Sequence, residues 1–121
     1  MRSFTLIELI VVIVIVGILA SFAMPGFYSA KQEALKKEAF ANLKLIQAAE
    51  KIYKMEIGAP YASASLSDIN DNLKLSLNAN NWLYETKVSG CAQATRVTDS
   101  TLFYSLLIDS TTDPVVGVAC S

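Results

Sequence analysis

One carboxylate, that of Glu8, stands at the edge of an apolar segment that is long enough to cross a membrane. The residues before it run Ser3-Phe4-Thr5-Leu6-Ile7, and no charged residue follows until Lys31. A membrane-spanning helix needs roughly 20 apolar residues, and a charge within such a helix is costly enough to indicate a function. The alternative is that Glu8 lies near the end of the span and reaches back to the headgroups, but its neighbours favour a more specific role.

These neighbours resemble the amino-terminal signature of type IV pilins and the related type II secretion pseudopilins. In that family a short basic leader precedes a Phe, and a Glu follows four residues later. Phe4 and Glu8 match these two residues, and Arg2 supplies the basic leader. Gly17 and Pro25 match a Gly and a Pro that family members carry in the hydrophobic helix. The resemblance is close over the first half of the chain.

The resemblance implies that the chain matures by cleavage. A prepilin peptidase would remove residues 1–3, cutting between Ser3 and Phe4, and would methylate the new Phe4 amine. The family carries Gly before the cut, where this chain has Ser3, also a small residue. The amine is a cation, so Glu8 of an incoming subunit can face the Phe4 amine of a subunit already in place. Such a pair neutralises a buried charge and sets the register of assembly; Thr5 is expected only as a small residue at the helix start.

The composition argues against an enzyme. There is no His, which removes the commonest general base and metal ligand, and no phosphate-binding, nucleophile-elbow or zinc-protease motif. The two cysteines, Cys91 and Cys120, cannot build a standard zinc site without His. Asp99, Asp109 and Asp113 lack the regular spacing of calcium ligands. We therefore expect no catalytic residues, cofactor, metal or small-molecule substrate.

The two cysteines bear on location. The apolar stretch runs directly into a charged segment, unlike a secretory signal peptide, so the mature chain is expected to keep it. The resemblance places the part that follows outside the inner membrane, where a disulfide between Cys91 and Cys120 is the natural outcome. It would close a loop of about 30 residues and stabilise the head by roughly 3–4 kcal/mol. Two free thiols are the alternative.

Residues 4–57 are predicted to form one long helix with two different halves. Residues 4–30 are apolar on all sides, as in a segment covered by lipid or by other protein. Residues 31–57 are amphipathic. Gly17 and Pro25 weaken the first half, because Pro removes a backbone donor and crowds the preceding turn. A kink or local unwinding is therefore expected there.

The amphipathic half carries two apolar stripes with helical spacing. One stripe suffices for the core of a small head, so the second is expected to pack other helices; one broad core face is the alternative. Glu33 with Lys37 and Glu50 with Lys54 are expected to form ion pairs four residues apart. The first stripe comprises Leu35, Ala39, Leu43, Ile46, Ala49, Tyr53 and Ile57, and the second Ala34, Ala41, Leu45, Ala48 and Ile52.

Residues 58–81 are predicted to connect the helix to a sheet. Gly58 and Pro60 end the helix, since Gly can take the left-handed cap and Pro cannot continue the helix. The connector is rich in Ser and Asn. Residues 67–70 could form a single helical turn with Ser65 or Ser67 as its cap.

Residues 82–121 alternate polar and apolar side chains with a period of two, which indicates strands. Short turns between them predict an antiparallel sheet of three to four strands, with the first stripe of the helix against one face. The expected fold is therefore α+β, and the resemblance implies a pilin fold with a disulfide-bounded carboxy-terminal region. The expected strands are residues 82–88, 92–97, 102–108 and 115–119.

The resemblance predicts a structural protein. We expect the major subunit of an extracellular type IV pilus, a helical homo-oligomer whose precursor resides in the inner membrane of a bacterium. Its partners would be copies of itself, the prepilin peptidase and the pilus assembly machinery. One alternative is a type II secretion pseudopilin that forms a periplasmic pseudopilus. Another is a membrane-anchored domain that does not polymerise.

Overall fold

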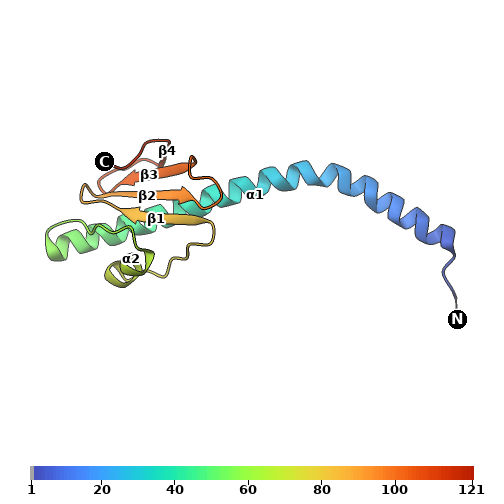
Figure 1. The fold of residues 1–121 in the computed structure, drawn as a ribbon, viewed down its shortest axis with the longest axis horizontal. Coiled ribbons are helices and arrows are strands. Elements are labelled where there is room, and N and C mark those ends of the chain that lie inside the picture. The colour runs from blue at the N-terminus through green and yellow to red at the C-terminus, as the bar shows by residue number, and fades with distance from the viewer. Residues whose placement is uncertain (1) are drawn as a thin grey trace. The chain divides into compact units, whose positions relative to one another are not determined.

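The computed structural model describes residues 2–121, so Met1 of the expected leader lies outside the described residues. Helices and strands follow in the order α1, α2, β1, β2, β3, β4 (Figure 1). The chain divides into two compact units, Met1–Ala34 and Leu35–Ser121. The elements are α1 Leu6–Ile57, α2 Leu66–Leu73, β1 Trp82–Thr86, β2 Cys91–Arg96, β3 Phe103–Leu107 and β4 Val115–Val116.

The first unit consists of the start of α1 and the residues before it. All of residues 2–34 are solvent-exposed, and Phe4, Phe22 and Phe27 are 87%, 81% and 70% exposed. By length and composition, α1 is able to cross a membrane. An apolar helix with no partner of its own has to be covered by lipid or by other protein.

Pro25 lies inside α1, and the helix continues on both sides of it. The local unwinding expected between Gly17 and Pro25 is therefore not seen in the single subunit. Pro25 lacks the N–H that would bond the Ser21 carbonyl, and the Ser21 hydroxyl donates to the Gly17 carbonyl at 2.9 Å. Pro25 makes this stretch of α1 easier to unwind, so unwinding in an assembly stays a prediction.

The second unit contains an antiparallel sheet in which the strands are neighbours in chain order, β1-β2-β3-β4. Trp82 pairs with Arg96, and Tyr104 pairs with Ala94 on one side and Val116 on the other. This confirms the expected meander, although β1, β3 and β4 are shorter than expected and β2 begins one residue earlier. The expected last strand, residues 115–119, ends at Val116 because Gly117, at φ 71°, turns the chain away.

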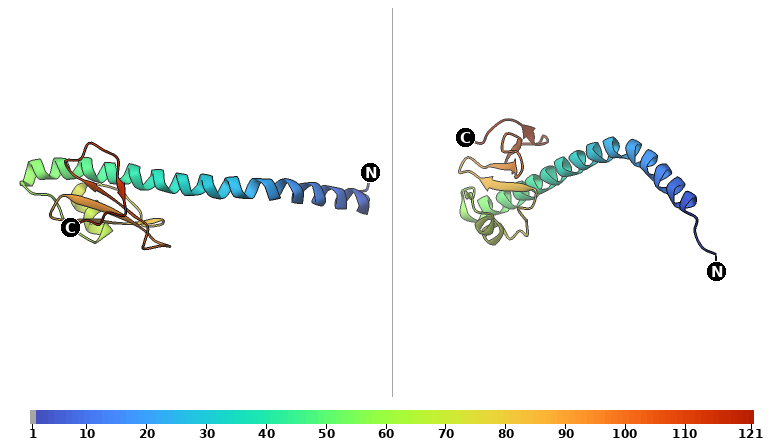
Figure 2. Two further views of the ribbon diagram at one scale, coloured as in Figure 1. Left: turned by 90° about the horizontal axis from the view of Figure 1, so that it is seen from above. Right: turned by 45° about the vertical axis from the view of Figure 1, so that its right-hand side comes forward.

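The core lies between the second half of α1 and one face of the sheet, which lie side by side in Figures 1 and 2. Trp82 is 1% exposed, and its indole Nε1 donates to the Leu35 carbonyl at 3.0 Å. Leu43 and Ile46 are fully buried. The first stripe of α1 therefore packs against the sheet as predicted, up to its half-buried members Ala49 and Tyr53.

The second stripe of α1 is exposed in the second unit. Leu45 is 47% and Ile52 is 56% exposed, and Ala41 and Ala48 are exposed as well. The alternative of one broad core face is therefore wrong. Ile57, placed in the first stripe, is also exposed, because α1 runs past the sheet before it ends.

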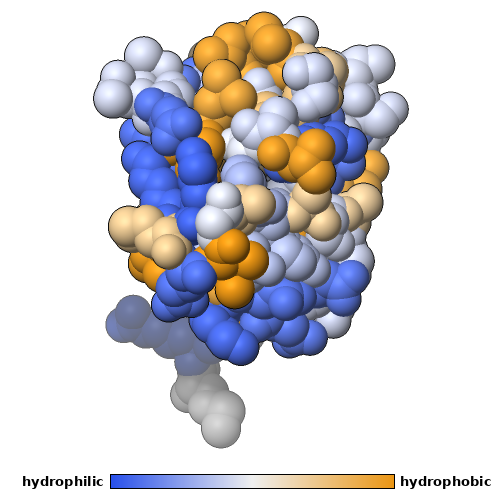
Figure 3. Space-filling view, turned by 90° about the vertical axis from the view of Figure 1, so that its left-hand side faces the viewer, coloured by the Kyte–Doolittle hydropathy of each residue, from blue (hydrophilic) through white to orange (hydrophobic). Residues whose placement is uncertain are grey.

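The connector contains α2, an eight-residue helix where a single turn was expected. Ser65 caps it by accepting a hydrogen bond from the Asp68 amide at 3.5 Å, and Lys74 ends it at φ 57°. Ile69 and Leu73 are buried in the core. The face of the molecule seen in Figure 3 carries hydrophilic residues over much of its area, with hydrophobic residues in separate groups.

Candidate assembly site at the start of the long helix

Thr5 and Glu8 form a reciprocal pair at the amino-terminal end of α1. The Glu8 amide donates to the Thr5 hydroxyl at 3.3 Å. The Thr5 amide and the Thr5 hydroxyl both lie 3.4 Å from Glu8 Oε2. This is the capping-box arrangement, in which two amides of the first turn find side-chain acceptors. The helix therefore begins at Leu6 rather than at the expected Phe4.

The cap holds the Glu8 carboxylate in the first turn. A negative charge is favourable there, because the helix dipole places a partial positive charge at its amino-terminal end. Arg2, Ser3 and Phe4 precede the helix and, with Glu8, line an open hollow of about 550 Å³. Ser3 and Phe4 are exposed, so the bond between them is accessible to a peptidase.

Sequence reasoning missed the role of Thr5. The signal was present, since a Thr followed three residues later by a Glu before an apolar run is the capping-box pattern. The pattern is local, and both side chains are supplied by one turn. Thr5 is therefore a positioning residue for Glu8 as well as a small residue at the helix start.

One comparison with known proteins matches this end of the chain, and others match about half of the chain. A family model described as the prokaryotic N-terminal methylation motif matches residues 1–24. The type IV major pilin protein PilA of Myxococcus xanthus is 44% identical over 55 residues, 46% of this chain and 25% of PilA. The type II secretion system core protein G of Escherichia coli is 40% identical over 55 residues, 46% of this chain and 38% of that protein.

These matches support the type IV pilin and pseudopilin family. The type IV major fimbrial protein FimA of Dichelobacter nodosus is 36% identical over 66 residues, 53% of this chain and 41% of FimA. The chain thus covers less than half the length of each of these relatives. No solved structure matches it. Because pilins and a secretion protein match at similar identity, the comparisons support the family and leave pilus and pseudopilus open.

The carboxy-terminal segment of the chain is fixed to the sheet. Cys91 and Cys120 are joined in a disulfide, so the alternative of two free thiols is wrong. The Cys120 amide donates to Gln93 Oε1 at 3.0 Å, and the Ser89 hydroxyl donates to the Ser121 carbonyl at 2.9 Å. The tail after β4 is therefore tied to β2 and to the turn before it.

The loop between β3 and β4 is held against α1 by long side chains. Lys44 Nζ lies 2.5 Å from Asp113 Oδ1, and Lys54 Nζ lies 3.8 Å from Asp109 Oδ2. Gln47 Nε2 donates to the Leu107 carbonyl at 2.7 Å and to the Ser110 carbonyl at 2.9 Å. Both loop aspartates therefore face ammonium groups.

Asp99 lies in the turn between β2 and β3. Its carboxylate is hydrogen-bonded within that turn, to Thr101. Hydrogen bonds from the Thr101 hydroxyl and amide, at 2.6 and 3.0 Å, lower the pKa of the Asp99 carboxyl. Among residues 2–121 no three His, Cys, Asp or Glu side chains lie close enough together to hold a metal ion.

Glu50 is a buried carboxylate that sequence reasoning misplaced. It is 2% exposed, and its Oε2 accepts a hydrogen bond from the Tyr61 amide at 2.9 Å. The expected pair with Lys54 is wrong, because Lys54 reaches Asp109 instead. Burial raises the pKa of the Glu50 carboxyl, and the bond from Tyr61 offsets part of the rise. Glu50 anchors the connector to the last turns of α1.

Proposed function

We propose that the chain is the structural subunit of an extracellular type IV pilus and polymerises through α1 after cleavage between Ser3 and Phe4. The observation that carries the proposal is an exposed apolar helix with one capped carboxylate, Glu8, in its first turn. Such a surface is stable in lipid or against like helices. A subunit that is stored in the inner membrane and then enters a filament needs a surface that is stable in both environments.

The polar contact of assembly would join Glu8 of one subunit to the Phe4 amine of another. Phe4 is 87% exposed, so its amine is accessible once residues 1–3 are removed by the prepilin peptidase. Opposite charges attract strongly where water is excluded. A misplaced subunit would leave Glu8 unpaired in an apolar setting, so the pair selects one register.

The head supports a pilus over a pseudopilus. Major pseudopilins are expected to carry an Asp-rich calcium loop, whereas Asp109 and Asp113 here face Lys54 and Lys44. The positive charge beside these two carboxylates is therefore supplied by lysine side chains of α1. The Cys91–Cys120 bridge also resembles the disulfide-bounded carboxy-terminal region of many pilins.

The second candidate is a type II secretion pseudopilin in a short periplasmic filament. Its support is the 40% identity to the type II secretion system core protein G of Escherichia coli. The third interpretation, an anchored domain that never polymerises, gives Glu8 no partner to offset the cost of its charge.

Electron microscopy of material sheared from the cell surface tests the proposal. We expect thin filaments that contain this chain by mass spectrometry, both in wild-type cells and in cells without type II secretion genes. Surface filaments that lack the chain, or that require the secretion genes, would favour the pseudopilin. Absence of any multimer after chemical cross-linking of whole cells would favour the non-polymerising domain.

A further inference from the structure

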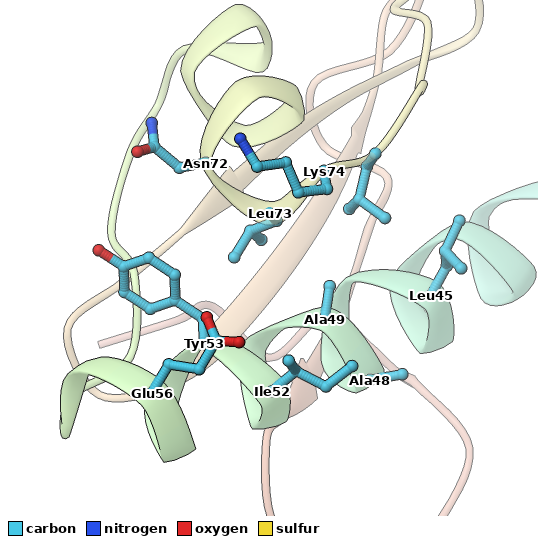
Figure 4. A pocket seen from close by; sticks show the side chains of 10 residues that line it. Leu45, Ala48, Ala49, Ile52, Tyr53, Glu56, Asn72, Leu73 and Lys74 are labelled. Carbon is cyan, nitrogen blue, oxygen red and sulfur yellow. The ribbon is translucent and has the colours of Figure 1, made fainter.

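A groove separates the exposed side of α1 from α2 and the residues that follow it (Figure 4). We name it the α1–α2 groove, and its volume is about 400 Å³. Leu45, Ala49 and Ile52 line it from α1, and Leu73 and Leu75 line it from the other side. Figure 4 shows Leu73 reaching from α2 toward α1. Ala49 contributes only a methyl group, so the groove is hollow between larger side chains.

The α1 side of this groove has the spacing of a helix-packing seam. Ala41, Leu45, Ala48, Ile52 and Met55 alternate steps of four and three residues along α1. All five are exposed, so the core of the second unit does not use them. An apolar repeat of this kind favours another helix as partner, because side chains of the partner enter the holes between the repeat residues.

We infer that the α1–α2 groove receives apolar side chains from residues 9–28 of a second copy of the chain. This inference rests on the proposed function and names the surface that the apolar helix meets. Residues 9–28 are uncharged and exposed. The groove carries one charge of each sign, Glu56 and Lys74, so an uncharged occupant meets no net charge there.

The occupant comes from another copy because both surfaces belong to the unbroken helix α1, and a helix does not fold back onto itself. The groove of one copy and the apolar segment of the next are different surfaces, so the contact is heterologous. Heterologous contacts that do not close produce helical filaments. The inference also assigns α2 a role, since Leu73 and Leu75 form the wall that faces the exposed seam of α1.

The first test places a charge in the groove of the full chain. Ile52→Lys is matched by Leu83→Lys on β1, because the two side chains are 56% and 55% exposed. Neither change should lower the melting temperature of the head. We expect Ile52→Lys to reduce filament yield by about tenfold or more, since each 1.4 kcal/mol lost from a contact is a tenfold loss in affinity, while Leu83→Lys assembles normally.

The second test locates the occupant by disulfide cross-linking in intact filaments. Ile52→Cys is combined in turn with Val12→Cys, Val16→Cys or Phe22→Cys, which lie on three different turns of the apolar segment. A heterologous contact predicts a ladder of multimers on a non-reducing gel for at least one double variant. The single variants should give no ladder.

Normal filament yield from Ile52→Lys together with no ladder from any double variant would overturn the inference. So would a Cys at position 52 that joins only another position 52, or a protein other than this chain. These outcomes leave the pilus proposal intact, because filaments would still form. Failure of the wild-type chain to form surface filaments would instead contradict the proposed function.

Discussion

Glu8 and Thr5 form two reciprocal hydrogen bonds across the first turn of α1. The Glu8 amide donates to the Thr5 hydroxyl, and the Thr5 amide donates to Glu8 Oε2. Both contacts from Thr5 use Oε2. The second carboxylate oxygen, Oε1, is therefore the one that we expect to meet the Phe4 amine of another subunit. In this arrangement capping and assembly use opposite sides of one carboxylate.

We predict that Glu8→Ala blocks filament assembly while membrane insertion and folding of the head stay normal. Removal of a charge makes insertion easier, so lost filaments could not be attributed to a failed membrane segment. Thr5→Ala is the matched control: it removes the cap, at about 1 kcal/mol, and keeps the charge. Sheared filament yield should vanish for Glu8→Ala and only decrease for Thr5→Ala. Normal yield from Glu8→Ala would contradict the pairing role.

We predict that the chain in filaments begins at Phe4 and carries one methyl group on its amine. Residues 2–5 precede α1 and are exposed, which suits a peptidase that needs extended backbone. Mass spectrometry of filaments should show the loss of residues 1–3. Ser3→Gly, the residue that the family carries before the cut, should give the same mature mass. Assembled subunits that retain Met1 would refute the maturation argument.

The disulfide should be a major source of stability in the head. Cys120→Ser in residues 31–121 removes a bridge with a sequence separation of 29, worth roughly 3–4 kcal/mol. We expect the melting temperature to fall by at least about 10 °C. Ser89→Ala removes only the hydrogen bond to the Ser121 carbonyl, which contributes about 1 kcal/mol. Equal melting temperatures for Cys120→Ser and the wild type would mean that the bridge is incidental.

Glu50 should give the head a pH-dependent stability. Burial raises the pKa of its carboxyl in the folded state, so the folded head binds a proton more readily than the unfolded chain. The contribution of Glu50 to stability therefore falls as pH rises from the ordinary glutamate pKa of about 4.3 through the raised value. The measurement is the midpoint of urea unfolding as a function of pH. Glu50→Gln should remove the fall in this midpoint over that pH range.

Glu56→Gln is the control for Glu50, because Glu56 is exposed on the same helix. Its profile of urea midpoint against pH should follow that of the wild type. Identical profiles for Glu50→Gln and the wild type would show that the Glu50 carboxyl titrates alike in the folded and unfolded states. The hydrogen bond to Tyr61 would then be the whole contribution of Glu50.

The parts of the fold that were predicted from sequence depend on local periodicity. Leu35 and Leu43 recur on one side of a helix, Trp82 and Tyr84 on one side of a strand, and all four are buried. Such patterns need no knowledge of the partner surface. The same holds for the end of α1, where Gly58 adopts φ 94°.

The parts that were missed depend on residues distant in sequence. Glu50 has the sequence spacing of an exposed helical acid. Its hydrogen-bond donor, the Tyr61 amide, lies eleven residues away on the connector. Lys44 meets Asp113 across 69 residues, and no periodicity connects them. The α1–α2 groove likewise requires the position of α2 on the second unit, which the polar composition of the connector does not encode. Thr5 differs from these cases, since its capping pattern is local and is present in the sequence itself.

The last prediction concerns the filament core. Helices from many copies should bundle along residues 4–57, with the strands from Trp82 onward facing outward, where their polar edges meet water. Within the core, the chain between Gly17 and Pro25 should be extended, because Pro25 leaves the Ser21 carbonyl without its helical donor. Neighbouring helices can cover backbone groups that lipid cannot.

A filament map at side-chain resolution decides this, and Pro25→Ala provides its control. Restoring the donor should favour continuous helix, so the extended stretch should shorten in Pro25→Ala filaments if they form. An unbroken helix through Pro25 in wild-type filaments would show that the subunit enters the filament with α1 unchanged. Heads packed at the filament axis would contradict the arrangement as a whole, because the exposed apolar surface of residues 6–28 would then face water.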